Sequence, residues 1–99
     1  MIILMGVIHL DPIDVNEFVT DIPAITRSTR SEKGCLFYAV TLDDAPAGRL
    51  LMAGRWQDQQ ALTAHHETPD TLAFLEKWNG RMKSDIEKYD VTNEQSSVD

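Results

Sequence analysis

Three predicted strands of this chain carry apolar residues on both faces, and this feature limits the folds that the chain can adopt. Alternate residues of a strand point to opposite sides of the sheet. The segment from Ile2 to Leu10 has Ile2, Leu4 and Ile8 on one side and Ile3, Met5 and Val7 on the other. The segments 35–42 and 49–56 share this pattern. A sheet covered by helices on one face and wetted on the other should instead alternate apolar and polar residues.

A second copy of the chain is the simplest cover for the second apolar face. Isolated exposed apolar residues are normal on a monomer, but here three predicted strands agree. An uncovered apolar face of that size would tend to associate with other protein surfaces. We therefore predict that the protein is a homodimer.

The remaining segments favour helices on one side of this sheet. Apolar residues recur at helical spacing from Pro12 to about Arg30, and Pro23 predicts a kink or break inside that helix. Asp58 is placed to cap a short helix, and Thr68-Pro69 begins a last helix with an apolar stripe that ends at Met82. A final strand is expected at about 85–92.

The element order β-α-β-β-α-β predicts an α+β, ferredoxin-like fold with a four-stranded antiparallel sheet. We expect one domain over residues 1–92 and a polar, disordered C-terminal tail over residues 93–99.

Composition and charge limit the possible partners. Lys and Arg number 9 against 16 Asp and Glu, which gives a net charge of −7, so a nucleic-acid backbone would be repelled. The single cysteine, Cys35, excludes an internal disulfide, no Cys/His spacing suits a metal, and a reducing cytoplasm is expected. The apolar N-terminal segment is about half the length that spans a bilayer, so no membrane partner is expected.

Two motifs are similar to those of one family. Residues 29–36, Thr-Arg-Ser-Glu-Lys-Gly-Cys-Leu, resemble the Ser-Arg-x-Glu-x-Gly-Cys junction of antibiotic biosynthesis monooxygenase (ABM) domains. Arg55-Trp56, Ala61-Leu62-x-x-His65 and Thr68-Pro69 resemble the family's second motif, so the resemblance covers about residues 2–91. It implies a dimeric α/β barrel with a pocket between sheet and helices. The chain departs from the pattern at Asp70, where many members carry a second histidine.

His65 is the candidate catalytic residue, because an imidazole titrates near neutrality and can act as a general base. The alternative is a helix-terminal histidine that bonds to nearby carbonyls. Trp56 is the candidate floor of an aromatic-binding pocket, and core packing is the alternative. Phe74 and Trp78, one helical turn apart, are expected to line the same cavity or to be simply core. His9 and Tyr38 are further candidates for hydrogen bonds to a ligand.

The resemblance implies a cofactor-independent monooxygenase that uses O2 and a small aromatic phenol, quinol or anthrone-like substrate, with no metal or other cofactor. A non-enzymatic dimer that binds a small ligand or serves as an accessory subunit is the alternative. A haem-binding or haem-degrading protein of the same fold is disfavoured, because its asparagine on the first strand and its histidine on the last helix are absent.

Overall fold

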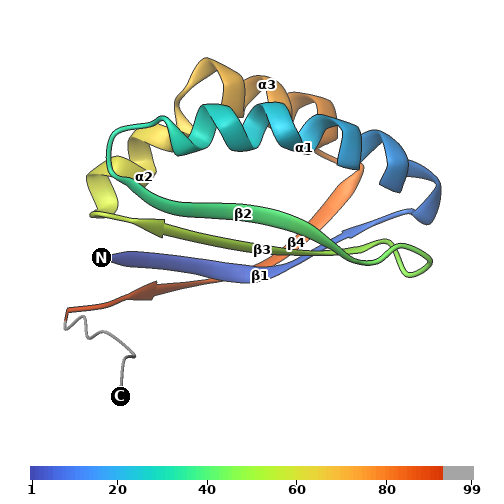
Figure 1. Ribbon diagram of the computed structural model, residues 1–99, viewed down its shortest axis with the longest axis horizontal. Helices are drawn as coiled ribbons and strands as arrows, with labels where there is room; N and C mark the ends of the chain where they lie inside the picture. Colours follow the sequence, from blue (N-terminus) through green and yellow to red (C-terminus); the bar gives the residue numbers. More distant parts are fainter. Residues whose placement is uncertain (93–99) are drawn as a thin grey trace.

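The computed structural model describes residues 1–92 as one four-stranded antiparallel sheet with helices on one face (Figure 1). The elements in chain order are β1 (Ile2–Leu10), the 3-10 turn η1 (Pro12–Asp14), α1 (Val15–Arg30), β2 (Cys35–Asp44), β3 (Arg49–Trp56), α2 (Gln59–His66), α3 (Pro69–Trp78) and β4 (Met82–Asp90). The strands lie in the order β2-β3-β1-β4. This confirms the predicted α+β ferredoxin-like fold. The predicted tail at 93–99 lies outside the described residues.

Side-chain caps start the helical segments where the sequence predicts them. The Asp58 carboxylate accepts a hydrogen bond from the Ala61 amide at 2.8 Å, and Thr68 Oγ1 accepts one from the Thr71 amide at 3.3 Å. Each bond satisfies one of the amides that the first turn of a helix leaves without a partner. The cap at Thr68 and proline at the next position separate α3 from α2.

One expected boundary is wrong, and the helix is not broken at Pro23. The helix α1 runs without a break through Pro23, which lies on its exposed side, while Phe18 and Ile25 are buried on either side of it. Packing of that buried face outweighs the lost hydrogen bond, which costs about 3 kcal/mol in an ordinary helix. The last strand runs over Met82–Asp90 rather than 85–92, because α3 already ends at Trp78 and Met82 pairs with Leu10 of β1.

The inner face of the sheet supports two separate apolar clusters. The larger one joins Ile8, Leu10 and Leu50 to Val15, Phe18 and Trp78, and the Phe18 ring lies edge-on to Trp78 at 4.8 Å and to Phe74 at 5.5 Å. The smaller one contains Ile2, Trp56 and Leu62. The helices therefore pack on the sheet through two clusters, and the smaller cluster is next to α2.

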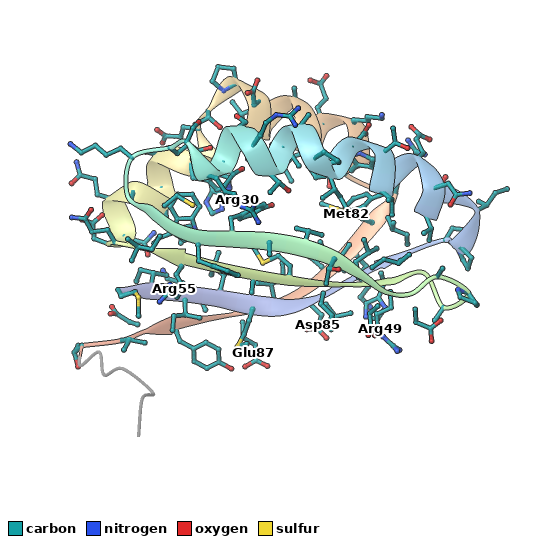
Figure 2. All side chains as sticks on the ribbon, viewed as in Figure 1. Arg30, Arg49, Arg55, Met82, Asp85 and Glu87 are labelled. Carbon is teal, nitrogen blue, oxygen red and sulfur yellow. The ribbon has the colours of Figure 1, made fainter. Side chains whose placement is uncertain are left out.

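The outer face of the sheet carries exposed apolar side chains. Met5 is 51 % exposed, Phe37 45 % and Leu51 41 %, although each lies within a strand. They line a hollow of about 510 Å³ that crosses all four strands. Figure 2 shows Arg55, Asp85 and Glu87 on this side, away from the helices. None of the helices within residues 1–92 is both long and apolar enough to cross a bilayer.

Phe18 and its neighbour Val19 give a matched test of the larger cluster. Phe18 is 1 % exposed and Val19 is 37 % exposed on the same turn of α1. We expect Phe18→Ala to lower the free energy of unfolding in urea by about 3–5 kcal/mol, because the ring is lost and a cavity is left. Val19→Ala should change it by only about 0.5 kcal/mol. Equal losses in the two variants would contradict this account of the core.

Candidate functional site

His65 is buried at the end of α2 and contacts a glutamate from a distant part of the chain. Its Nδ1 lies 2.8 Å from Oε1 of Glu32, which stands in the turn between α1 and β2. The Thr71 hydroxyl lies 3.4 Å from the same nitrogen. The alternative was that His65 bonds to carbonyls at the end of its helix. In the structure Nδ1 contacts side-chain oxygens, not carbonyls. The imidazole is oriented by a carboxylate instead.

A glycine in the first motif brings these two segments together. Gly34 has a φ of +84°, a conformation that glycine adopts without strain, and its carbonyl accepts a hydrogen bond from the Gln57 amide at 2.8 Å. A Cβ at Gly34 would lie only 2.5 Å from the Cβ of Ala61. The alanine of the second motif therefore packs directly on the glycine of the first, and this contact places His65 beside Glu32.

The hydrogen bond to the Glu32 carboxylate favours one tautomer of His65. An ionised carboxylate only accepts hydrogen bonds, so Nδ1 of a neutral His65 carries the proton and Nε2 has a free lone pair. Within residues 1–92, Nε2 has no hydrogen-bond partner. The ring is thus arranged to take up a proton at Nε2, and Glu32 would stabilise the resulting imidazolium.

Aromatic rings surround the imidazole. The Trp56 ring, fully buried at the end of β3, lies 4.6 Å from the His65 ring at an angle of 33°, and the Tyr38 ring lies 6.1 Å away. Burial raises the pKa of Tyr38 to about 12, with smaller contributions from Cys35 and Glu32. Tyr38 is therefore a neutral phenol at physiological pH. The structure brings three predicted site residues, His65, Trp56 and Tyr38, into one cluster.

Two buried polar atoms of this cluster have no hydrogen-bond partner within the described residues. They are the indole nitrogen of Trp56 and the second carboxylate oxygen of Glu32. The hydroxyls of Thr26 and Thr29 on α1 are also buried without a partner in the described part of the chain. Buried polar groups are normally paired, and an unpaired one costs about 1–3 kcal/mol. Unpaired donors and acceptors beside a buried base are typical of a site that binds a polar ligand or water.

The other predicted site residues lie elsewhere. Phe74 and Trp78 pack with Phe18 in the larger cluster, so the expectation that they share a cavity with Trp56 is wrong. Helical spacing predicts that the two residues share one side of α3, but it does not predict which end of the sheet that side covers. His9 is exposed on the outer face of β1, opposite Arg49 and Lys83, rather than at this site.

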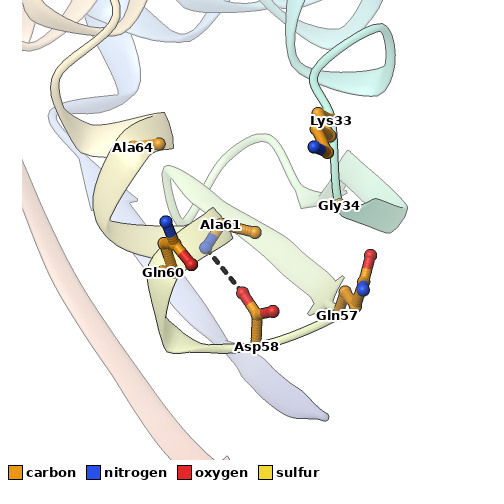
Figure 3. A pocket seen from close by; sticks show the side chains of 7 residues that line it. All are labelled: Lys33, Gly34, Gln57, Asp58, Gln60, Ala61 and Ala64. Carbon is orange, nitrogen blue, oxygen red and sulfur yellow. Dashed lines mark hydrogen bonds between the residues drawn. The ribbon is translucent and has the colours of Figure 1, made fainter.

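The hollows near α2 do not open onto His65. Figure 3 shows one of about 280 Å³ beside the start of α2, lined by polar residues that include Lys33, Gln57 and Gln60. Its lining does not include His65 or Trp56. Within residues 1–92, no group of three or more His, Cys, Asp or Glu side chains is arranged to hold a metal ion. The candidate site is therefore the buried cluster around His65 itself.

Glu32 and Thr71 are site residues that the sequence analysis did not single out. The signal for Glu32 was present, because it is the acidic residue of the first motif and His65 is the histidine of the second. Their contact spans 33 positions and needed the fold to become visible. Asp70, the position at which the chain departs from the motif, accepts a hydrogen bond from Ser28 at 2.6 Å and so ties α3 to α1.

The fold and this cluster define a ferredoxin-like α+β domain with a buried histidine and glutamate pair between the sheet and α2. The chain belongs to the antibiotic biosynthesis monooxygenase family, whose family model matches residues 1–77. The resemblance proposed from the two sequence motifs is thereby confirmed.

Individual relatives support this assignment at low sequence identity. The chain is 30 % identical over 76 residues to the Synechocystis protein sll1783, covering 77 % of this chain but about half, 52 %, of that relative. It is 26 % identical over 77 residues to a Bacillus subtilis protein named "Putative monooxygenase YcnE", covering 78 % of this chain and 81 % of that protein.

Solved structures share the fold. The crystal structure titled as a putative antibiotic biosynthesis monooxygenase from Deinococcus radiodurans matches with a TM-score of 0.85 and 21 % identity over 100 % of both chains. The structure of Rv0793 from Mycobacterium tuberculosis matches with a TM-score of 0.82 and 20 % identity, covering 96 % of this chain and 98 % of that one. At these identities the likeness shows the fold alone.

The raised pKa of Tyr38 predicts a specific loss of stability in alkali. The folded state holds the phenolic proton more tightly than the unfolded state, whose tyrosine pKa is 10. The free energy of unfolding should therefore fall as the pH rises from about 10 towards about 12. Urea denaturation across this range checks the prediction. Tyr38→Phe should reduce the fall, whereas Tyr89→Phe, which removes the exposed tyrosine, should retain most of it.

Proposed function

We propose that this chain is a cofactor-independent monooxygenase that acts on a small aromatic phenol, quinol or anthrone-like substrate. The observation that carries the proposal is the buried His65, held by Glu32 at 2.8 Å with Nε2 left without a partner among residues 1–92. A base oriented in this way can remove a proton from an activated O–H or C–H group. Membership of the family and the name of the Bacillus subtilis relative support the same reaction class.

The proposed reaction begins with transfer of a substrate proton to Nε2 of His65. The substrate anion is electron-rich and transfers electrons to O2, and one oxygen atom forms a bond to the substrate carbon. For an anthrone-like CH2 group, the second oxygen leaves as water when the carbonyl forms, so the substrate supplies all the electrons that reduce O2. The protein contributes the base, the orientation and a water-poor surrounding.

Trp56 and Tyr38 are proposed to bind the substrate oxygen. Within residues 1–92 the indole N–H of Trp56 is buried without a partner, and burial raises the pKa of Tyr38 to about 12, so the phenol holds its proton more tightly than usual. Both groups can donate a hydrogen bond to a phenolate or enolate oxygen. Such donors stabilise negative charge as it develops on the substrate, which favours deprotonation by His65.

Oxygen uptake with 1,4-naphthohydroquinone and anthrone tests the role of His65. We expect His65→Ala to lower the protein-dependent rate by about 100-fold or more, which is the usual contribution of a general base. Glu32→Gln keeps the shape of the carboxylate but not its charge, so we expect an intermediate loss. The matched control is His66→Ala, because His66 is the exposed neighbour in the same helix.

Two results would contradict this proposal. Uptake that is unchanged in His65→Ala would mean that the base lies elsewhere. Ligand-induced thermal stabilisation of the wild type without any protein-dependent uptake would instead support a non-enzymatic ligand-binding protein.

We also propose that the protein acts as a homodimer in which the outer faces of two sheets pack together. The proposal is supported by Met5, Phe37 and Leu51, which remain substantially exposed around a hollow of about 510 Å³. The same face also carries opposite charges, with Asp85 and Glu87 on β4 and Arg55 on β3. A two-fold arrangement brings one patch against its own copy, so a face with apolar centre and charges of both signs can match itself.

Sedimentation at micromolar concentration tests the dimer. We expect the wild type to have twice the 11.2 kDa mass of one chain. Leu51→Lys should shift it to the monomer, because a charge would be buried at the centre of the interface. Leu72→Lys replaces a leucine on α3 that is 53 % exposed, against 41 % for Leu51, and should leave the mass unchanged. A wild type that sediments as a single well-folded chain would exclude the dimer.

A further inference from the structure

A hollow of about 320 Å³ lies between α1 and β2, which is an edge strand of the sheet. Its apolar lining includes Ile22, Pro23 and Val40, and its polar lining consists of Thr26, Arg27 and Arg30. The volume is at the lower end of the roughly 300–1,000 Å³ found for ligand pockets. The hollow therefore has the size for a small molecule with an apolar part and a group that arginine recognises.

The two arginines are not neutralised by the protein within residues 1–92. Three other cationic side chains, Arg49, Lys77 and Arg81, each form an ion pair with an aspartate or glutamate. No such pair within 4.0 Å involves Arg27 or Arg30. The chain as a whole has a net charge of −7. Two uncompensated guanidinium groups one helical turn apart are thus a local positive site on an acidic protein.

Arg30 is held in place by the strand beside it. Its Nε donates a hydrogen bond to the backbone carbonyl of Tyr38 at 2.9 Å, and Figure 2 shows the side chain between α1 and β2. The two terminal nitrogens of the guanidinium have no acceptor within the described residues. A guanidinium group that is already held at Nε loses less conformational entropy on binding a carboxylate than a freely moving one.

Thr26 lines the same hollow and has an unpaired polar atom buried behind its surface. Its side-chain oxygen is fully enclosed and has no hydrogen-bond partner within the described residues. Thr26 precedes Arg30 by one turn of α1, so both residues lie on the same side of the helix. A hydroxyl can donate one hydrogen bond and accept others, and a buried hydroxyl normally has a partner.

We propose that this hollow binds a small carboxylate with an apolar body, such as an aryl carboxylic acid. Arg27 and Arg30 bind the carboxylate, and the body packs on Ile22 and Val40. Arginine presents parallel N–H groups that match the two oxygens of a carboxylate. This binding site is distinct from the His65 cluster and does not depend on the proposed oxygenation.

Calorimetric titration with benzoate, benzamide and acetate tests the ligand class. Benzamide keeps the ring and the planar shape without the charge, and acetate keeps the charge without the ring. We expect benzoate to bind at least about tenfold more tightly than either, because charge-assisted hydrogen bonds and apolar contact both contribute. Equal affinity for benzoate and benzamide, or for benzoate and acetate, would overturn the proposal.

Variants locate the bound benzoate. Arg27→Gln is the first choice, because Arg27 makes no hydrogen bond within the described residues, and we expect it to weaken benzoate binding about tenfold. The double variant with Arg30→Gln should abolish measurable binding. Lys33→Gln is the matched control, because Lys33 is an exposed cation that does not line this hollow, and it should leave the affinity unchanged.

His65→Ala distinguishes this site from the proposed oxygenase site. We expect it to bind benzoate with the affinity of the wild type, whatever its effect on oxygen uptake. Benzoate binding that is lost in His65→Ala, or retained in the double arginine variant, would place the ligand elsewhere and overturn the proposal.

Discussion

The close approach of α2 to the turn between α1 and β2 is the contact on which the candidate site depends. Gly34 and Ala61 meet so closely that any side chain at position 34 would push the helix away. The hydrogen bond from the Gln57 amide to the Gly34 carbonyl holds the start of the same segment. Glu32 and His65 stand at the two sides of this contact and are joined at 2.8 Å. The pair therefore exists only when the whole fold has formed.

The interior between sheet and helices differs at its two ends: one is an apolar cluster, and the other is the polar candidate site. At one end Phe18 and Trp78 pack edge to face within an apolar cluster, and the Trp78 indole N–H donates to Asp21 at 3.0 Å. At the other end the Trp56 indole N–H and a Glu32 oxygen are buried without partners in the part of the chain that the structure describes. Unpaired buried groups lower stability, and folds retain them mainly where a site requires them. The well-packed end offsets the cost of the polar end.

The sequence predicted the elements well because the signals for them are local. Apolar alternation, proline and capping side chains act over a few residues, and they placed every strand and helix within a few positions. Pro23 misled because packing of distant residues outweighed its local effect. Phe74 and Trp78 misled because helical spacing gives a common side but no position along the sheet. The contact of Glu32 with His65 depends on the complete fold, so local patterns singled out His65 but not the glutamate that orients it.

The strand β3 joins the site to the outer face of the sheet. Trp56 and Gly54 face inward, and the indole nitrogen lies 3.4 Å from where a Cβ at Gly54 would stand. Leu51 and Arg55 of the same strand face outward. A partner that covers the outer face in the proposed dimer would restrict the motion of the strand that holds Trp56. Because successive residues of one strand serve both faces, assembly and the geometry around His65 would be linked through the backbone of β3.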